Sequence, residues 1–176
     1  MTYIETLNWI HSHKANGRRP SLERMRYLLN LLDNPQDKFP AVHVVGTNGK
    51  GSTTSFLQHI LTASSYKTGT FTSPFITRFN ERIAIDGKEI SDSNLVKTAQ
   101  AIKPIVDSNV FQEKVGKVTE FELVTALMFC YFATINPVDV AVIEAGIGGT
   151  FDSTNVFTAK AVSYTHLRAH ETLRHL

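Results

Sequence analysis

Apolar residues near the start of the chain recur three and four positions apart, which is the spacing of amphipathic helices. Thr2 and Glu5 have capping-box spacing and predict a short N-terminal helix. Ser21 is the predicted cap of a second helix, whose apolar face consists of Leu22, Met25, Leu28, Leu29 and Leu32. Three further helical patterns follow, at about 56–61, at 92–107 with Asp92 or Ser93 as its cap, and at 120–135.

Short apolar runs between these helices predict strands. Residues 41–45 are rich in valine, and residues 138–143 are almost wholly apolar, as expected of a parallel strand buried on both faces. Residues 67–72 form a third run, and residues 82–90 alternate around an Asp-Gly pair, which favours a β-hairpin. Because strands alternate with helices, we expect the α/β class with a mostly parallel sheet flanked by helices.

Composition narrows the range of partners. The chain has 176 residues, a formal net charge of +2 and 42% hydrophobic residues, which is typical of a globular domain able to bury a sizeable core. A charge near zero gives no reason to expect nucleic acid or an anionic membrane as a partner. A single cysteine fits a reducing compartment. With no secretion signal and no apolar run of roughly 20 residues, we expect a cytoplasmic protein.

The strongest chemical signal is the glycine-rich turn at residues 46–53, between a predicted strand and a predicted helix. Glycines let backbone N–H groups converge on a phosphate, and the helix N-terminus adds the positive end of its dipole. Lys50 supplies a charge for the β- and γ-phosphates, and the hydroxyl of Ser52 or Thr53 can contact phosphate or Mg²⁺. This combination favours nucleotide binding over a plain glycine-rich βα turn.

Two oxygen-bearing residues at predicted strand ends are candidate magnesium ligands. Glu144 follows the apolar strand at 138–143, and ligands of α/β sheets lie at the carboxyl ends of strands. Its carboxylate can hold Mg²⁺ directly or through water, although a solvent-facing strand terminus is the alternative. Ser73 follows the strand after the glycine-rich turn, where its hydroxyl could also reach Mg²⁺. Glu81 and Arg82, further along, could simply pair on the surface.

Four blocks in this order resemble the folylpolyglutamate synthases and dihydrofolate synthases, relatives of the Mur peptide ligases. The blocks are residues 46–52, 72–83, 119–122 and 144–155. Phe75 stands where many relatives have histidine. The resemblance covers roughly residues 1–162 and implies the three-layer P-loop fold of the Mur ligase central domain, here as an incomplete ATP-binding domain.

The resemblance also implies roles for individual residues. ATP phosphates would be bound by Thr47, Asn48, Gly49, Lys50, Gly51 and Ser52. Mg²⁺ would be held by Ser73 and Glu144, with Lys50 and Glu144 as the catalytic pair. The folate or pteridine pocket would be lined by Thr119, Glu120, Phe121, Glu122, Phe151, Asp152 and Ser153. From the residues alone, Glu120 and Glu122 could equally be first-turn helix residues, and Asp152 could be a turn former.

The implied reaction is ATP-dependent amide formation between L-glutamate and a folate or dihydropteroate carboxylate, through an acyl phosphate. Because the carboxylate and the triphosphate repel each other, Mg²⁺ and Lys50 would neutralise both. The expected partners are these small molecules, and we expect a monomer. Two alternatives remain open at this point, namely a Mur-type peptide ligase of cell-wall synthesis and a non-catalytic nucleotide-binding fragment.

The family pattern stops after Val162. Relatives continue into a strand, a histidine that holds a second Mg²⁺, a lysine that becomes carbamylated, and a C-terminal domain. Here residues 163–176 contain three of the seven histidines and no buried-strand pattern. We interpret them as a non-native tail, assign neither His166 nor His170 as a ligand, and expect this truncated chain to be inactive or nearly so.

Overall fold

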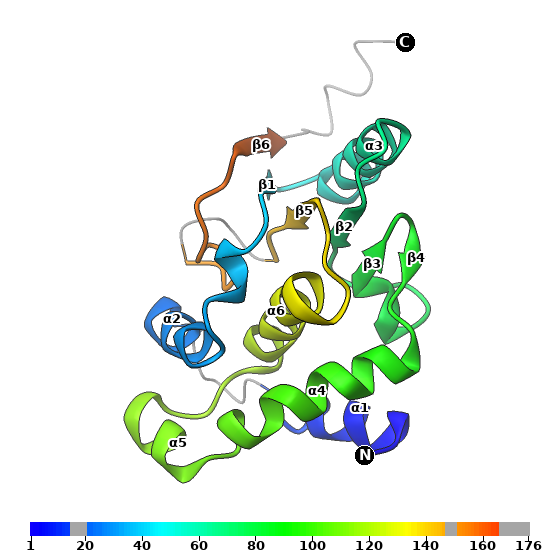
Figure 1. Ribbon diagram of the computed structural model, residues 1–176. Coiled ribbons are helices and arrows are strands. Elements are labelled where there is room, and N and C mark those ends of the chain that lie inside the picture. Colours follow the sequence, from blue (N-terminus) through cyan, green and yellow to red (C-terminus); the bar gives the residue numbers. More distant parts are fainter. Residues whose placement is uncertain (15–20, 147–150, 166–176) are drawn as a thin grey trace.

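One mixed sheet organises the chain. The structure is a computed structural model that describes residues 1–14, 21–146 and 151–165. The strands are β1 (Ala41–Gly46), β2 (Thr68–Phe71), β3 (Ile83–Ile85), β4 (Lys88–Glu89), β5 (Val140–Glu144) and β6 (Ala161–Thr165). They lie in the order β4-β3-β2-β5-β1-β6 (Figure 1).

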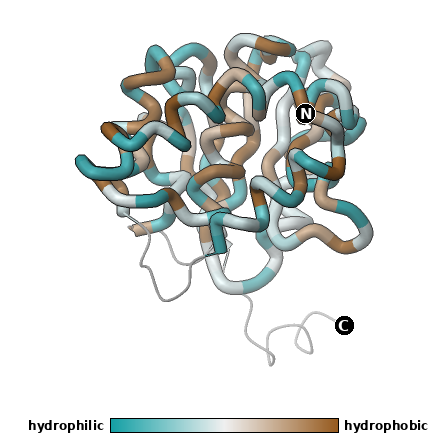
Figure 2. Tube along the Cα trace, turned by 90° about the horizontal axis from the view of Figure 1, so that it is seen from below, coloured by the Kyte–Doolittle hydropathy of each residue, from teal (hydrophilic) through white to brown (hydrophobic). Residues whose placement is uncertain are grey.

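Helices cover both faces of this sheet. They are α1 (Tyr3–His11), α2 (Leu22–Leu31), α3 (Lys50–Ala63), α4 (Asp92–Val106), α5 (Asn109–Val115) and α6 (Glu120–Cys130). Three short helical segments are η1 (Pro35–Asp37), η2 (Phe79–Arg82) and η3 (Tyr131–Ile135). In Figure 2 hydrophobic and hydrophilic positions alternate along the trace, as amphipathic elements require.

The sheet is mostly parallel, as the sequence predicts. β2, β5, β1 and β6 run parallel, whereas β3 and β4 form an antiparallel hairpin at one edge. The hairpin turns at Asp86 and Gly87, which both have positive φ (51° and 74°), the backbone that this Asp-Gly pair favours. β5 lies between β1 and β2, so the carboxyl ends of these three strands meet at one edge of the sheet.

Alternate residues of the central strands face different helices. Ala141 and Ile143 of β5 join the apolar core beneath α1, α2, α4 and α6. Val142, between them, is also fully buried but points to the opposite face, where α3 packs against β1, β2 and β5. This is the expected three-layer arrangement (Figure 1).

The capping predictions hold with one exception. Thr2 and Glu5 form the predicted capping box, and Ser21 accepts a hydrogen bond from Arg24 N at the start of α2. The prediction that Asp92 or Ser93 caps α4 was wrong. Ser91 is the cap, because its extended backbone lets its Oγ accept from Asn94 N. The short helix α5 was not predicted, since Phe111 is its only buried residue.

α6 is the central helix of the core. Its residues from Glu122 to Cys130 are all buried, and η3 extends it as a π-helix to Ile135, close to the predicted helix at 120–135. Burial raises the pKa of Cys130 to about 12, so this thiol stays protonated at neutral pH. In the described ranges no single helix is long and apolar enough to cross a membrane; only α5 with α6–η3, bent by 118°, would pass on length and composition.

β6 extends past the predicted end of the family pattern. It pairs in parallel with β1 from Ala161 to Thr165, so three residues of the segment that we interpret as a non-native tail belong to the sheet. Val162 and Tyr164 are 64% and 71% exposed because β6 is an edge strand. This exposure explains why residues 161–165 lack the pattern of a buried strand. The native or foreign origin of residues 163–176 stays a prediction.

A buried ion pair joins the beginnings of α2 and α6. Glu122 is fully buried, and its two carboxylate oxygens accept from Arg24 Nη2 and Nε, both at 2.9 Å. The same oxygens accept from the backbone N–H groups of Ser21 (2.9 Å) and Thr119 (2.7 Å), the caps of the two helices. One carboxylate therefore neutralises a buried guanidinium and satisfies two helix ends.

We expect Glu122→Ala to lower the free energy of unfolding by about 3–5 kcal/mol, because it removes the carboxylate that accepts two hydrogen bonds from the buried Arg24 guanidinium and one from each helix cap. Urea denaturation at pH 7 measures this loss. Asp33→Asn is the control, since it removes an exposed ion pair with Lys38 and should change stability little. Equal losses in the two variants would contradict a dominant role for the buried pair.

Candidate functional site

The glycine-rich turn leads from β1 directly into α3. Gly46 has φ 141°, and a Cβ there would lie 1.8 Å from the Thr165 carbonyl oxygen, so only glycine fits beside β6. Gly49 has φ 81° and is the N-cap of α3. The first intrahelical bond runs from Thr53 N to Gly49 O. The N–H groups of Lys50, Gly51 and Ser52 therefore have no intrahelical partner, which is the geometry that binds phosphate.

Three parallel strands bring the predicted catalytic and metal residues together. Glu144 ends β5, beside the turn that follows β1, and Lys50 Nζ lies 3.8 Å from Glu144 Oε1. From the other side, Ser73, two residues past β2, donates its backbone N–H to Glu144 Oε2 at 3.3 Å. A Cβ on Gly51 would be 4.0 Å from the same oxygen. Lys50 and Glu144, which the resemblance names as the catalytic pair, thus meet across the sheet edge, although their roles stay predictions.

The electrostatics of Glu144 suit a cation. Glu144 is 4% exposed, and this burial raises the pKa of its carboxyl group, while the Ser73 N–H and the Lys50 charge act in the opposite direction. The described residues contain no group of three or more His, Cys, Asp or Glu side chains that could cage a metal. Magnesium usually has one or two protein carboxylates and completes its shell with water and phosphate oxygens. The residues present therefore fit a magnesium ion that arrives with a nucleotide.

The predicted pocket residues of α6 divide into two groups. Thr119 and Glu122 are buried and form the capping box of α6, so Glu122 faces Arg24 rather than a ligand. This contact supports the alternative reading of Glu122 as a first-turn residue, and its role in lining the pocket stays a prediction. Phe121 packs 6.0 Å from the Phe71 ring and so closely on the Gly146 backbone that a Cβ there would be 2.6 Å from it. Phe121 therefore supports the ends of β2 and β5.

The second predicted pocket segment follows β5. Phe151 is 79% exposed, whereas Asp152 and Ser153 are buried. Asp152 Oδ1 accepts from Thr154 N and Thr154 Oγ1, so Asp152 forms the turn that was its alternative interpretation. The Oγ of Ser153 is buried and has no hydrogen-bond partner. Residues 147–150 of the family motif lie outside the described part of the chain.

Comparisons with known proteins decide which P-loop family these residues represent. The chain is 46% identical over 154 residues to a dihydrofolate synthase/folylpolyglutamate synthase of Bacillus subtilis, an alignment that covers 88% of this chain and 36% of the relative. It is 46% identical over 158 residues to a folylpolyglutamate synthase of Lacticaseibacillus casei, which covers 90% of this chain and 37% of the relative. The chain is a homologue of the folylpolyglutamate and dihydrofolate synthases.

Solved structures agree with this homology. The structure of a folylpolyglutamate synthase (FPGS) in complex with AMPPCP and folate superposes on this chain with a TM-score of 0.88 at 44% identity. The superposition covers 96% of this chain and 41% of the other. A folylpolyglutamate synthase of Mycobacterium tuberculosis complexed with ADP superposes with a TM-score of 0.84 at 36% identity, covering 92% and 36%. No family model matches the chain. The chain thus spans about two fifths of the length of the folylpolyglutamate synthases that it matches.

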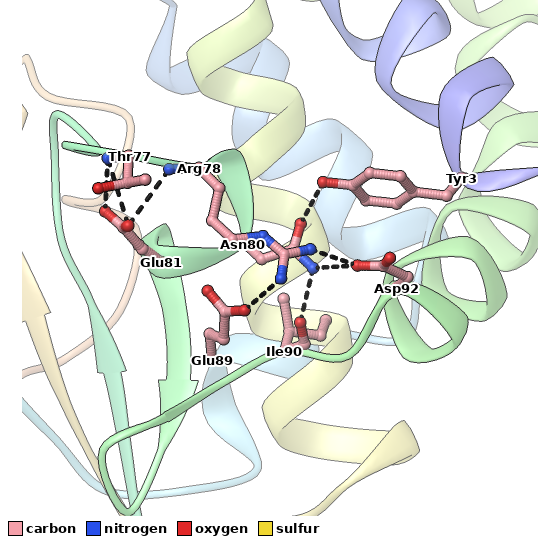
Figure 3. Close-up of polar contacts among 8 residues, drawn as sticks. All are labelled: Tyr3, Thr77, Arg78, Asn80, Glu81, Glu89, Ile90 and Asp92. Atoms are coloured by element: carbon pink, nitrogen blue, oxygen red, sulfur yellow. Dashed lines mark hydrogen bonds and ion pairs between the residues drawn. The ribbon is translucent and has the colours of Figure 1, made fainter.

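The loop after Ser73, a family block, is fixed by polar contacts (Figure 3). The carboxylate of Glu81 accepts hydrogen bonds from the backbone N–H groups of Ile76, Thr77 and Arg78, and these bonds lower the pKa of Glu81. The guanidinium of Arg78 bridges Glu89 (2.6 Å) and Asp92 (2.7 Å). Glu81 and Arg82 do not pair on the surface, contrary to our simplest reading of the sequence.

A buried asparagine joins this loop to two other elements. The side chain of Asn80 is 1% exposed, donates to Ile90 O at 2.7 Å and to Asp92 Oδ1 at 2.8 Å, and accepts from the hydroxyl of Tyr3 at 2.9 Å. These contacts tie the loop to the start of α4 and to α1. These contacts among the chain's own residues give the loop a defined conformation next to Ser73.

A buried histidine supports the other family block through a contact that the sequence did not predict. His43 Nε2 lies 2.9 Å from Thr154 Oγ1, and Thr154 Oγ1 donates to Asp152 Oδ1 at 2.6 Å. Because the threonine proton goes to Asp152, His43 donates from Nε2. Burial lowers the pKa of His43, and the charge of Asp152 partly opposes this shift. The sequence signal was weak, because a single histidine in an apolar strand has no ligand spacing.

We expect the stability of the chain to fall on acidification through His43. Its pKa in the folded chain lies below the ordinary value of 6.5, so the unfolded chain binds more protons as pH falls through that value. Relative to His43→Gln, the wild-type free energy of unfolding should therefore decrease between pH 7.5 and pH 5.5. Urea titrations at several pH values test this, and parallel pH profiles for the two proteins would rule it out.

Proposed function

We propose that this chain is the nucleotide-binding part of an ATP-dependent ligase that joins L-glutamate to a folate or dihydropteroate carboxylate. The main support is the convergence of Lys50, Glu144 and Ser73 at the carboxyl ends of β1, β5 and β2. The named relatives favour this substrate class over a Mur-type peptide ligase. A monomer in the cytoplasm, without nucleic-acid or membrane partners, stays a prediction.

In the proposed reaction a carboxylate oxygen of the acid attacks the γ-phosphorus of ATP, and the bond to the β–γ bridging oxygen breaks. ADP leaves and an acyl phosphate remains. The amine of L-glutamate then attacks the acyl carbon, loses a proton, and inorganic phosphate leaves with the former acyl oxygen. The first step brings the anionic carboxylate up to the anionic triphosphate, and both steps release an anion, ADP or phosphate. Fixed positive charge and in-line positioning are therefore the main requirements on the protein.

The chain's residues can meet these requirements. The free N–H groups at the start of α3 would bind the β- and γ-phosphates, together with the Lys50 ammonium group. Glu144 and Ser73 would hold Mg²⁺, which supplies positive charge next to the phosphates. Thr47, Asn48, Gly49, Gly51 and Ser52 complete the proposed phosphate-binding turn. Glu120, Phe121 and Phe151 remain the exposed or half-buried candidates for the acid substrate.

We expect MgATP to stabilise the purified chain against thermal unfolding, with about 2.7 kcal/mol at a hundredfold excess over Kd. Lys50→Ala should abolish most of this stabilisation, because it removes the cation nearest the phosphates. Lys97→Ala, an exposed lysine on α4, is the matched control and should behave as the wild type. A wild-type Tm unchanged by MgATP would refute nucleotide binding and favour a fragment without this function.

Glu144→Gln separates the metal from the nucleotide. The amide keeps the shape of the side chain but loses the charge that a magnesium ion requires. We expect the variant to retain the stabilisation that ATP gives in EDTA and to lose the extra stabilisation that Mg²⁺ gives the wild type. An undiminished magnesium effect on the Tm of the variant would show that Glu144 does not hold the ion.

A further inference from the structure

Arg82, at the end of η2, carries a charge that nothing in the described chain neutralises. Its guanidinium lies over the rings of Phe75 and Phe79, with the Cζ atom 5.2 Å and 5.7 Å from the ring centroids. Its Nε is buried and has no hydrogen-bond partner. Within residues 1–14, 21–146 and 151–165, no carboxylate forms an ion pair with this guanidinium.

Other arginines of the chain show what this guanidinium lacks. Arg24 forms bidentate hydrogen bonds with the Glu122 carboxylate, and Arg78 contacts two carboxylates. Desolvation lowers the pKa of Arg82, and the charge of Glu120 opposes this shift. The Glu120 carboxylate lies 3.2 Å from His11 Nδ1 and forms no ion pair with Arg82. A half-buried guanidinium without an acceptor is unfavourable in the free chain and gains more than an exposed one when an anion binds.

The position of Arg82 is next to the proposed magnesium site. Its carbonyl oxygen accepts from Thr72 N at 3.0 Å, and Thr72 immediately precedes Ser73, whose N–H contacts Glu144. The loop between Ser73 and Arg82 is held by Glu81, Arg78 and Asn80 (Figure 3). Arg82 is therefore presented at the same sheet edge by a segment that is already ordered.

We propose that Arg82 binds the carboxylate of the acid substrate, a specificity role that rests on the proposed ligase function. Phosphate is the less suitable anion for Arg82, because Lys50 and the N-terminus of α3 already form the proposed phosphate-binding site. With aromatic rings against its face, the guanidinium offers its edge, and this planar fork matches a carboxylate through two parallel hydrogen bonds. Phe75, 37% exposed, provides an apolar surface beside it for the body of an aromatic acid.

Binding of pteroate and of its uncharged methyl ester to the whole chain tests this assignment, with Mg-AMPPCP present to prevent turnover. The wild type should prefer the acid over the ester by about tenfold to a hundredfold, the range expected of a charge-assisted hydrogen bond. Arg82→Met should reduce this preference to near one and change the ester's affinity less than threefold. Arg82→Lys should keep part of the preference, since it retains the charge without the fork. Arg26→Met, at an exposed arginine on α2, is the control and should keep all of it.

The outcomes separate this proposal from the ligase function. A full preference for the acid in Arg82→Met would overturn the assignment, and so would an effect of the variant on L-glutamate binding alone. Absence of pteroate binding to the wild type would also overturn it, whereas the Lys50-dependent MgATP stabilisation would still support the nucleotide site. Because Arg82→Met should keep that stabilisation, the MgATP-induced shift in Tm also shows that the variant is folded.

Discussion

The insertion of β5 between β1 and β2 is the constraint on which the site depends. Parallel strands present their carboxyl ends at one edge, so this order places Glu144 between the turn that carries Lys50 and the loop that carries Ser73. A carboxylate 4% exposed at this position has few stabilising contacts of its own. The Ser73 N–H and the Lys50 ammonium group lower the free-energy cost of burying the Glu144 charge. Ser73 and Lys50 are also residues that the proposed chemistry requires.

Local sequence signals were sufficient wherever one element determined the outcome. The glycine-rich turn specified both its backbone and its position, because Gly46 and Gly49 need positive φ between a strand and a helix. The apolar run before Glu144 indicated a strand buried on both faces. In the structure this strand, β5, pairs with β1 in a register that sets Glu144 opposite Val44. The same reasoning failed at β6, whose exposure at the sheet edge removes the apolar pattern on which strand prediction relies.

Contacts between distant segments could not be predicted in this way. Glu122 looked like a pocket residue in the family block, yet its partner Arg24 lies 98 positions away, and only packing of α2 against α6 brings them together. His43 and Thr154 are 111 positions apart, and their contact depends on the turn that Asp152 forms. Residue type and spacing carry no information about such pairs, because the tertiary fold alone sets the distance.

Within the described residues Arg82 forms no ion pair, whereas Glu144 and Glu120 do, and this difference underlies the proposed binding of an anion by Arg82. Glu144 interacts with Lys50, Glu120 with His11, and Arg82 with the rings of Phe75 and Phe79. If Arg82 paired with either carboxylate, both charges would be neutralised and the edge would attract neither a cation nor an anion. The contacts of Glu81 and Asn80 fix the loop that leads to Arg82, and this edge of the described chain presents the buried carboxylate of Glu144 and the half-buried guanidinium of Arg82. Binding of a magnesium nucleotide and an organic acid would then relieve both desolvation costs, which couples affinity for the two ligands to the same fold.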